Sequence, residues 1–375
     1  MRKYYLDKIR WATVVLVMIY HVFWFFNALG ILGGIGGFYA HQPWDVFCTV
    51  VYPWFMALLF LIAGISAHYA LEKQGDGAFF RSKVHRLLAP STLGLFFYHW
   101  FTGFLNLKTS GAWDQIPAPV NWFAALLAGT GILWFIQMLF LFSLLLLLLR
   151  KIPGFETLCQ AGSRANLPAL LLLALPVRGA SMLLNTPVVI VYRWGIYGAV
   201  YLLGYLVFSH DRVQALLEEH HRLLAGSAVL SGLAYTLVFC GEDYTAGRCL
   251  THPLTCLYLW LMILAVLGCG RAWWGKAPAE YPGNTGKFYS YMARSGFGLY
   301  VVHYLICQTA GYVLKTYTAL PPVLIYAAVL AAVLGLSLVM YEILRRIPVI
   351  RYITFGIRTE SAGRADPSRD RPMTG

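Results

Sequence analysis

The feature that most constrains this chain is a series of ten apolar runs, most of them near 20 residues long. They occupy residues 9–29, 47–71, 87–106, 131–149, 167–184, 194–209, 223–240, 252–270, 295–315 and 322–344. A helix of about 20 apolar residues spans the hydrocarbon core of a bilayer. Because no water is available there, each segment must satisfy its own backbone polar groups, which favours helices. The pattern predicts an all-α integral membrane protein of about ten transmembrane helices.

The charged residues support a membrane location and give it a direction. Only 12% of the residues are charged, whereas soluble domains carry roughly 25%. Lysines and arginines gather in the loops after the second, fourth, sixth and eighth runs and are scarce in the loops between. Basic loops stay on the cytoplasmic side, so both termini are expected in the cytoplasm. The net charge of +13 is thereby explained by topology, and the expected partner is the lipid bilayer rather than a nucleic acid.

The organisation along the chain is simple. We expect a single transmembrane domain over residues 1–358 and a basic, disordered cytoplasmic tail over 359–375. The runs 167–184 and 194–209 are short and poorly bounded, and the apolar stretch 120–130 suggests an interfacial or re-entrant helix. The seven cysteines show no zinc-site spacing, so no metal is expected.

One face of the first run carries two ionisable groups. Arg10 stands at its cytoplasmic end and His21 follows eleven residues later, about 16 Å along a helix. Eleven residues are three full turns, so both side chains point the same way. A long anionic donor such as an acyl-CoA fits this layout, with its phosphates at the cytoplasmic mouth and His21 acting as a general base near mid-membrane. The alternative is an anchoring arginine and a histidine that bonds a neighbouring helix.

Two more histidines reach a similar depth. His303 lies in the run 295–315 and His99 in the run 87–106. Three imidazoles at one level suggest a polar cavity, and we assign a functional role to His303. For His99 we favour an interhelical hydrogen bond.

Several other charged residues are candidates for substrate binding. Arg81, Lys83 and Arg86 precede Pro90 at the inner mouth of the third run, where their charges suit donor phosphates; topology anchoring is the alternative. Glu342 ends the last run at the level of Arg10, and its partner is either Arg10, Arg345 or Arg346. Arg178 lies deep in the fifth run, where an unpaired guanidinium is costly, and we expect it to contact an acceptor.

At this point the chain resembles the acyltransferase family 3 membrane proteins over roughly residues 4–356. The matching segments are YYLDKIRWATVVLVMIYH with Arg10 and His21, FMALLFLIAGISAHYAL, RSKVHRLLAP with Arg86 and Pro90, LWFIQMLFLF with the Leu133 to Phe135 motif, SGFGLYVVHYLI with His303, and MYEILRRIPVIRYITFG with Glu342. Each segment is a loose match alone, but six occur in the family's order. The likeness is greatest to the glucan-modifying succinyltransferase type.

The resemblance implies acyl transfer from cytoplasmic acyl-CoA, acetyl or succinyl, to a hydroxyl of an extracytoplasmic carbohydrate. His21, Arg10 and His303 are then the expected catalytic residues. Arg81, Lys83, Arg86 and Glu342 are expected to bind the acyl-CoA, and Arg178 and Trp134 the acceptor. The expected location is the plasma membrane of a bacterium, and a homo-oligomer is left open.

Two departures from the family pattern bear on specificity. Ala63-Gly64 stands where Ser-Gly is common, and Ile132 where many members carry a histidine.

A polytopic transporter or flippase for an envelope glycan or a lipid-linked precursor is the main rival interpretation, since buried ionisable groups also mark transport pathways. The sequence shows none of the inverted repeats typical of transporters.

Overall fold

The computed structural model describes residues 3–31, 33–185 and 191–358, and these are organised as helices. Within these ranges the sole β pairing is an isolated bridge between Asn185 and Arg193. The tail 359–375 lies outside the described residues. The prediction of an all-α chain is therefore confirmed.

All ten apolar runs fall on helices. In chain order they are α1 (Tyr4–Phe25), α2 (Asp45–Val51) with α3 (Phe55–Lys73), α5 (Ala89–Gly94) with α6 (Trp100–Thr109), α8 (Leu133–Leu149), α10 (Leu167–Leu172) with α11 (Ala174–Ser181), α12 (Trp194–Leu206), α14 (His221–Phe239), α16 (Pro253–Trp274), α17 (Thr285–Tyr317) and α18 (Pro322–Leu344). The connecting helices are α4 (Asp76–Lys83), α7 (Asn121–Ala128), α9 (Phe155–Ser163), α13 (Asp211–Glu219), α15 (Gly247–Leu250) and α19 (Pro348–Phe355). Two π-helical turns, η1 (Val84–Leu88) and η2 (Leu95–His99), flank α5.

Six helices of the described chain are long and apolar enough to cross a membrane, and a bent pair raises the number to seven. The bent pair joins residues 118–128 to α8 at an angle of 61°, so the apolar stretch 120–130 forms a separate helix set off from the next one. The two short runs remain short as helices, at Leu167–Ser181 and Trp194–Leu206. The chain is thus a multi-pass membrane protein, while about ten spans and cytoplasmic termini stay predictions.

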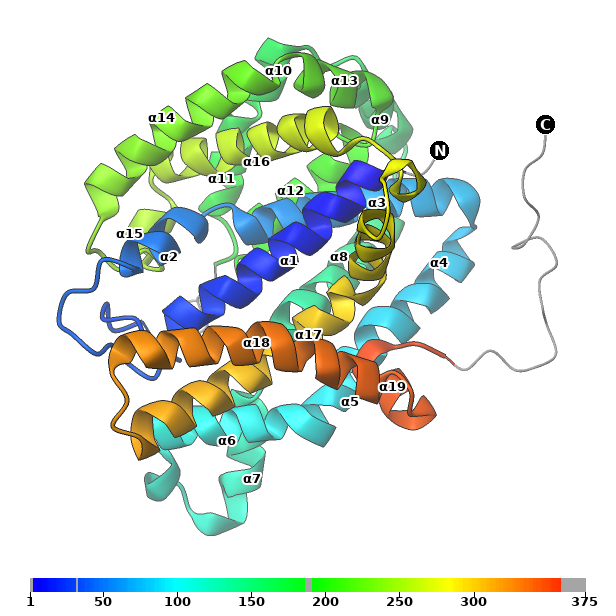
Figure 1. Cartoon of the computed structure of the whole chain (residues 1–375). Helices are drawn as coiled ribbons and strands as arrows, with labels where there is room; N and C mark the ends of the chain where they lie inside the picture. The colour runs from blue at the N-terminus through cyan, green and yellow to red at the C-terminus, as the bar shows by residue number, and fades with distance from the viewer. Residues whose placement is uncertain (1–2, 32, 186–190, 359–375) are drawn as a thin grey trace.

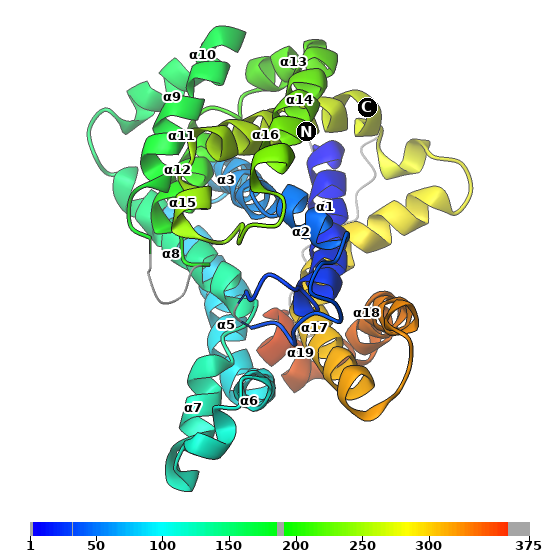
Figure 2. The same cartoon turned by 90° about the vertical axis from the view of Figure 1, so that its left-hand side faces the viewer.

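Helix α1 lies at the centre of the molecule (Figure 1) and packs against α2, α3, α16, α17 and α18. Helices α14 and α16 lie on one side of it and α17 and α18 on the other. Figure 2 shows α6 and α7 projecting from the rest as a pair. The central position of α1 brings both ends of this helix into contact with several neighbours.

The second apolar run is broken at Tyr52–Trp54, between α2 and α3. Pro53 lacks the backbone N–H that would continue the helical ladder. The carbonyl of Val50 instead accepts hydrogen bonds from the Trp54 indole at 3.1 Å and the Tyr258 hydroxyl at 2.9 Å. Side chains therefore satisfy the backbone at a break within the bundle, as a bilayer requires.

Helices α3 and α12 approach each other closely through two glycines. A Cβ at Gly64 would lie 2.0 Å from the Tyr201 carbonyl oxygen, and one at Gly204 would lie 2.2 Å from that of Leu61. Small residues permit this close contact between membrane helices. The contact holds α3, which carries Phe55 and Met56, directly against α12, which carries Tyr197.

Candidate active site

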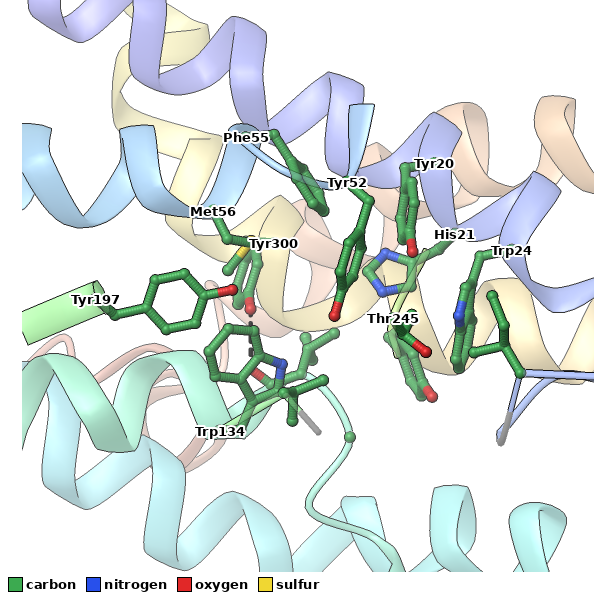
Figure 3. Close-up of a pocket in the computed structure, with 15 residues that line it drawn as sticks. Tyr20, His21, Trp24, Tyr52, Phe55, Met56, Trp134, Tyr197, Thr245 and Tyr300 are labelled. Carbon is green, nitrogen blue, oxygen red and sulfur yellow. Dashed lines mark hydrogen bonds between the residues drawn. The ribbon is translucent and has the colours of Figure 1, made fainter. Parts of the chain in front are cut away.

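An aromatic cavity of about 210 Å³ lies beside His21 (Figure 3). Its lining residues are Tyr20, His21, Trp24, Ile31, Tyr52, Phe55, Met56, Gly131, Ile132, Trp134, Val191, Tyr197, Thr245, Tyr300 and Tyr304. They come from α1, the break between α2 and α3, the start of α8, α12 and α17, with contributions from loop residues such as Ile31 and Thr245. Cavities of this kind, apolar with a few polar groups, are typical ligand sites.

His21 and His303 form a hydrogen-bonded pair at this cavity. Nδ1 of His303 lies 2.7 Å from the Tyr300 carbonyl oxygen, and Nε2 of His303 lies 3.2 Å from Nδ1 of His21. A carbonyl only accepts, so Nδ1 of neutral His303 carries the proton and Nε2 is the acceptor. His21 Nδ1 also lies 2.9 Å from the Val17 carbonyl oxygen, so this nitrogen is the donor to both. The second ring nitrogen, Nε2, is then the basic atom of an imidazole that lines the cavity.

His303 is fully buried and does not itself line the aromatic cavity. Its position behind His21 means that it acts through His21, by fixing the ring orientation and the tautomer. This is the arrangement in which a second group orients a general base. We therefore describe His303 as a positioning residue.

A second, larger cavity of about 930 Å³ lies towards the predicted cytoplasmic side. Its lining residues are Ser66, Ala70, Gln74, Phe79, Ser82, Lys83, His85, Arg86, Leu87, Arg294, Phe297, Gly298, Tyr341, Phe355, Gly356, Ile357 and Arg358. Four of them are lysine or arginine and none is acidic. The basic cavity is thus suited to a polyanionic ligand.

The C-terminal end of α19 shapes the basic cavity. Gly356 ends the helix with φ +65°, and a Cβ there would lie 2.1 Å from the His85 carbonyl oxygen. His85 also bonds the Tyr352 hydroxyl at 2.9 Å, and Arg358 approaches its Nε2 at 3.4 Å. Glycine is the residue that meets both the left-handed conformation and the close contact. The π-helical turn η1 and the segment after α19 are thereby held together around the cavity.

Arg10 adjoins the basic cavity through Ser66. Its guanidinium donates to the Ser66 hydroxyl at 2.7 Å and pairs with Asp7 at 3.1 Å. Burial of the Lys83 ammonium, together with the charges of Arg10 and Arg86, lowers its pKa to about 8. The aromatic ring of Phe79 lies 4.8 Å from the ammonium. Arg10, Lys83 and Arg86 therefore form one group of positive charges at this cavity.

The remaining candidates are placed as follows. Trp134 lines the aromatic cavity. Arg81 is exposed and is not among the residues that line the basic cavity. The Glu342 carboxylate accepts a hydrogen bond from the Tyr291 hydroxyl at 3.0 Å and pairs with the Arg345 guanidinium at 2.7 Å. Of the partners considered for Glu342, Arg345 is thus the nearer, and Arg346 also pairs with it at 3.8 Å. Arg178 is half-buried on α11 and does not line the aromatic cavity.

His99 lies close to the aromatic cavity but not on its surface. Its side chain is fully buried, and neither ring nitrogen has a hydrogen-bond partner in the described part of the chain. A Cβ at Gly131, which does line the cavity, would lie 3.4 Å from His99 Nδ1. The expected interhelical hydrogen bond of His99 is not present among the described residues.

Several site residues were not singled out from the sequence. Arg294 and Arg358 reach the basic cavity, and Tyr52, Tyr197 and Tyr300 reach the aromatic one. Pro53 within an apolar run was a usable signal for Tyr52, because breaks in membrane helices tend to line cavities. The arginines carried no such signal, since loop arginines equally serve as topology anchors.

The comparisons with known proteins bear on this pair of cavities. Neither a curated protein nor a solved structure matches the chain. The family described as "Acyltransferase domain" matches residues 3–342, which includes every helix that lines the aromatic cavity and most of the basic one. The match gives no support to the interpretation as a transporter. The chain belongs to the acyltransferase family 3 proteins and is a membrane acyltransferase.

Proposed function

We propose that this acyltransferase moves a short acyl group from cytoplasmic acyl-CoA to a hydroxyl of an extracytoplasmic carbohydrate, in the plasma membrane of a bacterium. The observation that carries the proposal is that α1 connects the two cavities. Arg10 contacts a lining residue of the basic cavity, and His21, three turns further along α1, lines the aromatic one.

The basic cavity is the proposed donor site. Its volume of about 930 Å³ is in the range of small-molecule sites. Lys83, Arg86, Arg294 and Arg358 line it, and a coenzyme A molecule carries a pyrophosphate and a further phosphate group. Arginine forks bind such phosphates through paired N–H groups, and lysine binds them as a point charge. The pantetheine arm then points towards His21.

The aromatic cavity favours an uncharged acyl group. Its lining contains no lysine and no arginine. The Arg193 guanidinium packs against the lining residue Tyr197 but does not itself line the cavity. The carboxylate of a succinyl group would therefore be buried there without a counter-charge in direct contact, which is costly. Of the two acyl groups that the resemblance implies, we therefore propose acetyl.

The same cavity is the proposed acceptor site. Two indole rings and five phenol rings surround it, from Trp24, Trp134, Tyr20, Tyr52, Tyr197, Tyr300 and Tyr304. Aromatic faces bury the apolar face of a sugar ring, and phenol hydroxyls supply hydrogen bonds to its edge. Ile31 and Thr245, at the cavity mouth, come from the loops that the topology places outside.

The reaction follows from the tautomer of His21. The acceptor oxygen attacks the thioester carbonyl carbon while its proton passes to Nε2 of His21. The Val17 carbonyl and His303 accept hydrogen bonds from Nδ1 and stabilise the imidazolium. The tetrahedral intermediate collapses, the C–S bond breaks, and His21 returns the proton to the sulfur. The products are the O-acyl ester and free CoA.

The test is CoA release by the purified full chain in liposomes, with acetyl-CoA or succinyl-CoA as donor and a soluble β-glucan oligosaccharide as acceptor. We expect acetyl-CoA turnover that His21→Ala abolishes. His41→Ala, at an exposed position outside both cavities, serves as the control and is expected to keep the wild-type rate.

Three results would contradict parts of the proposal. Equal rates for His21→Ala and the wild type would remove His21 from the mechanism. Faster turnover of succinyl-CoA would overturn the choice of acetyl. Binding of acyl-CoA without any acyl transfer to the glucan would exclude this class of carbohydrate as the acceptor.

A further inference from the structure

Acyl transfer creates a negative charge that His21 does not stabilise. When the acceptor attacks the thioester, the carbonyl oxygen becomes an oxyanion. Enzymes usually place a fixed hydrogen-bond donor at that point, and this is often their largest contribution to the rate. If the proposed function holds, the aromatic cavity must contain such a donor, and its hydroxyl groups can be examined one by one.

Three cavity hydroxyls are already engaged. Tyr20 and Tyr244 share a hydrogen bond between their hydroxyls at 3.3 Å, Tyr300 donates to the Ile132 carbonyl at 2.9 Å, and Thr245 donates to the Asp243 carboxylate at 2.6 Å. Tyr300 and Thr245 are committed to a carbonyl and a carboxylate, so they have no proton left for a substrate, whereas in the Tyr20–Tyr244 pair either hydroxyl can be the donor. The ring of Tyr197 packs against the Arg193 guanidinium, and the guanidinium carbon lies 5.9 Å from the centre of that ring.

The hydroxyl of Tyr52 is differently placed. No hydrogen-bond partner contacts it within the described ranges, although the residue lines the cavity. The hydroxyl of Tyr304 shares this property, so orientation rather than the lack of a partner favours Tyr52. Figure 3 shows this hydroxyl projecting into the space beside His21, with Trp134 on the other side. Of the labelled side chains, Tyr52 and His21 thus face the same volume, the volume in which the thioester carbon must lie for attack.

The protein holds Tyr52 in this position. The residue lies at the break between α2 and α3, where Pro53 ends the helical ladder and Val50 is satisfied by side chains. Its ring packs against Tyr244 at 5.0 Å and stacks on Tyr20 at 6.1 Å between ring centres. A donor fixed in this way needs no reorganisation when charge develops.

We propose that Tyr52 is the oxyanion donor, a catalytic residue that hydrogen-bonds the thioester carbonyl oxygen of the acyl donor. During attack, the acceptor proton goes to His21 Nε2 and the carbonyl π electrons move to the oxygen. The Tyr52 O–H donates a hydrogen bond to that oxygen and keeps its own proton. When the carbonyl reforms and the C–S bond breaks, the hydrogen bond weakens again.

The test compares three tyrosine-to-phenylalanine variants of the full chain in liposomes, with acetyl-CoA and a soluble β-glucan oligosaccharide. Tyr52→Phe removes the proposed donor. Tyr304→Phe removes another cavity hydroxyl. Tyr205→Phe changes a buried residue that lines neither cavity. The measured quantities are kcat, both KM values and the Kd of a non-reactive thioether analogue of acetyl-CoA.

We expect Tyr52→Phe to lower kcat by about 100-fold, the usual effect of losing one oxyanion donor. Both KM values and the Kd of the analogue should stay within about threefold, since these report ground-state binding. Tyr205→Phe should match the wild type. Tyr304→Phe should lower kcat less than Tyr52→Phe does.

Other outcomes would overturn the assignment. A wild-type kcat for Tyr52→Phe, or a larger loss for Tyr304→Phe, removes Tyr52 as the donor. A rise confined to the acceptor KM makes Tyr52 an acceptor-binding residue. Because the wild type is measured alongside, a lack of acyl-CoA turnover in every protein contradicts the proposed function with this donor and acceptor, and is distinguishable from these results.

Discussion

At the scale of single residues, the site depends on which nitrogen of each histidine carries a proton. The Tyr300 carbonyl fixes the proton of His303 on Nδ1, and His303 Nε2 in turn accepts from His21. The basic nitrogen of His21 is therefore set by the Val17 carbonyl, which Nδ1 of His21 contacts directly, and by His303. This chain of bonds makes His303 testable separately from His21.

We predict that His303→Leu lowers kcat by about 100-fold, because His21 loses the acceptor that orients its ring and, together with the Val17 carbonyl, stabilises its imidazolium. His303→Gln retains an amide oxygen that can accept from His21, and we expect it to recover much of this loss. Steady-state kinetics with acetyl-CoA measures both variants. A merely structural role would lower the folded fraction of both and leave kcat per folded molecule alike.

Lys83 gives the donor site a dependence on pH. Its pKa is lowered to about 8 by burial and by Arg10 and Arg86, so the ammonium is charged below that pH and neutral above it. Phosphate groups are already fully ionised in this range. We predict that the KM for acyl-CoA rises as the pH increases through about 8, while in Lys83→Arg, whose guanidinium stays charged, the KM stays flat. Measuring KM between about pH 6.5 and pH 9.5 checks this, and an equal rise in Lys83→Arg would contradict it.

At the scale of helices, the sequence predicted the elements well and their interruptions poorly. Length and hydropathy were enough to locate α1, α8 and α18, because a bilayer imposes both on every spanning segment. The run 47–71 was taken as one span and lies within one apolar span, Asp45–Lys73, but the irregular turn at Tyr52–Trp54 inside it was not predicted. A break depends on whether neighbours can satisfy the freed carbonyl, and here the neighbour is Tyr258, about 200 positions away in sequence.

The same reasoning separates the predictable part of the site from the rest. The three-turn spacing of Arg10 and His21 is a property of one helix, so it was visible in the sequence. The contact between His21 and His303 joins α1 to α17. Their equal depth was predicted, but equal depth on two helices does not imply that the side chains touch. The approach of Arg358 to His85 depends on how α19 folds back, which no local pattern encodes.

Helix packing makes its own prediction at the α3–α12 contact. Because a Cβ at Gly64 would lie 2.0 Å from the Tyr201 carbonyl oxygen, Gly64→Ala must separate the two helices. We expect a loss of about 3 kcal/mol, as for overpacking elsewhere, seen as a lower midpoint of thermal unfolding in detergent. Gly226→Ala on α14, where nothing lies within 4 Å, is the control and should equal or slightly exceed the wild-type stability. Equal midpoints for the two variants would show that the contact tolerates a methyl group.

At the scale of the whole molecule, the two cavities have opposite chemistry. One is basic and bordered by α4, η1 and the segment after α19, and the other is aromatic and lined in part by the loop residues Ile31 and Thr245. If basic loops face the cytoplasm, donor and acceptor approach from opposite sides of the membrane. The protein then transfers the acyl group across the membrane without moving either substrate through it.

This sidedness is testable because Cys240 is exposed in a loop that the topology places outside. In proteoliposomes of mixed orientation, a membrane-impermeant maleimide labels the molecules whose Cys240 faces the external solution. Those molecules expose the acceptor side, so acyl-CoA added externally should be used by the unlabelled fraction alone. We predict that the rate with external acyl-CoA is proportional to the unlabelled fraction across preparations of different orientation, with Cys240→Ser as the labelling control. A rate proportional to the labelled fraction would place the basic cavity and the Cys240 loop on the same side. The number of spans between α4 and Cys240 would then have to change by one.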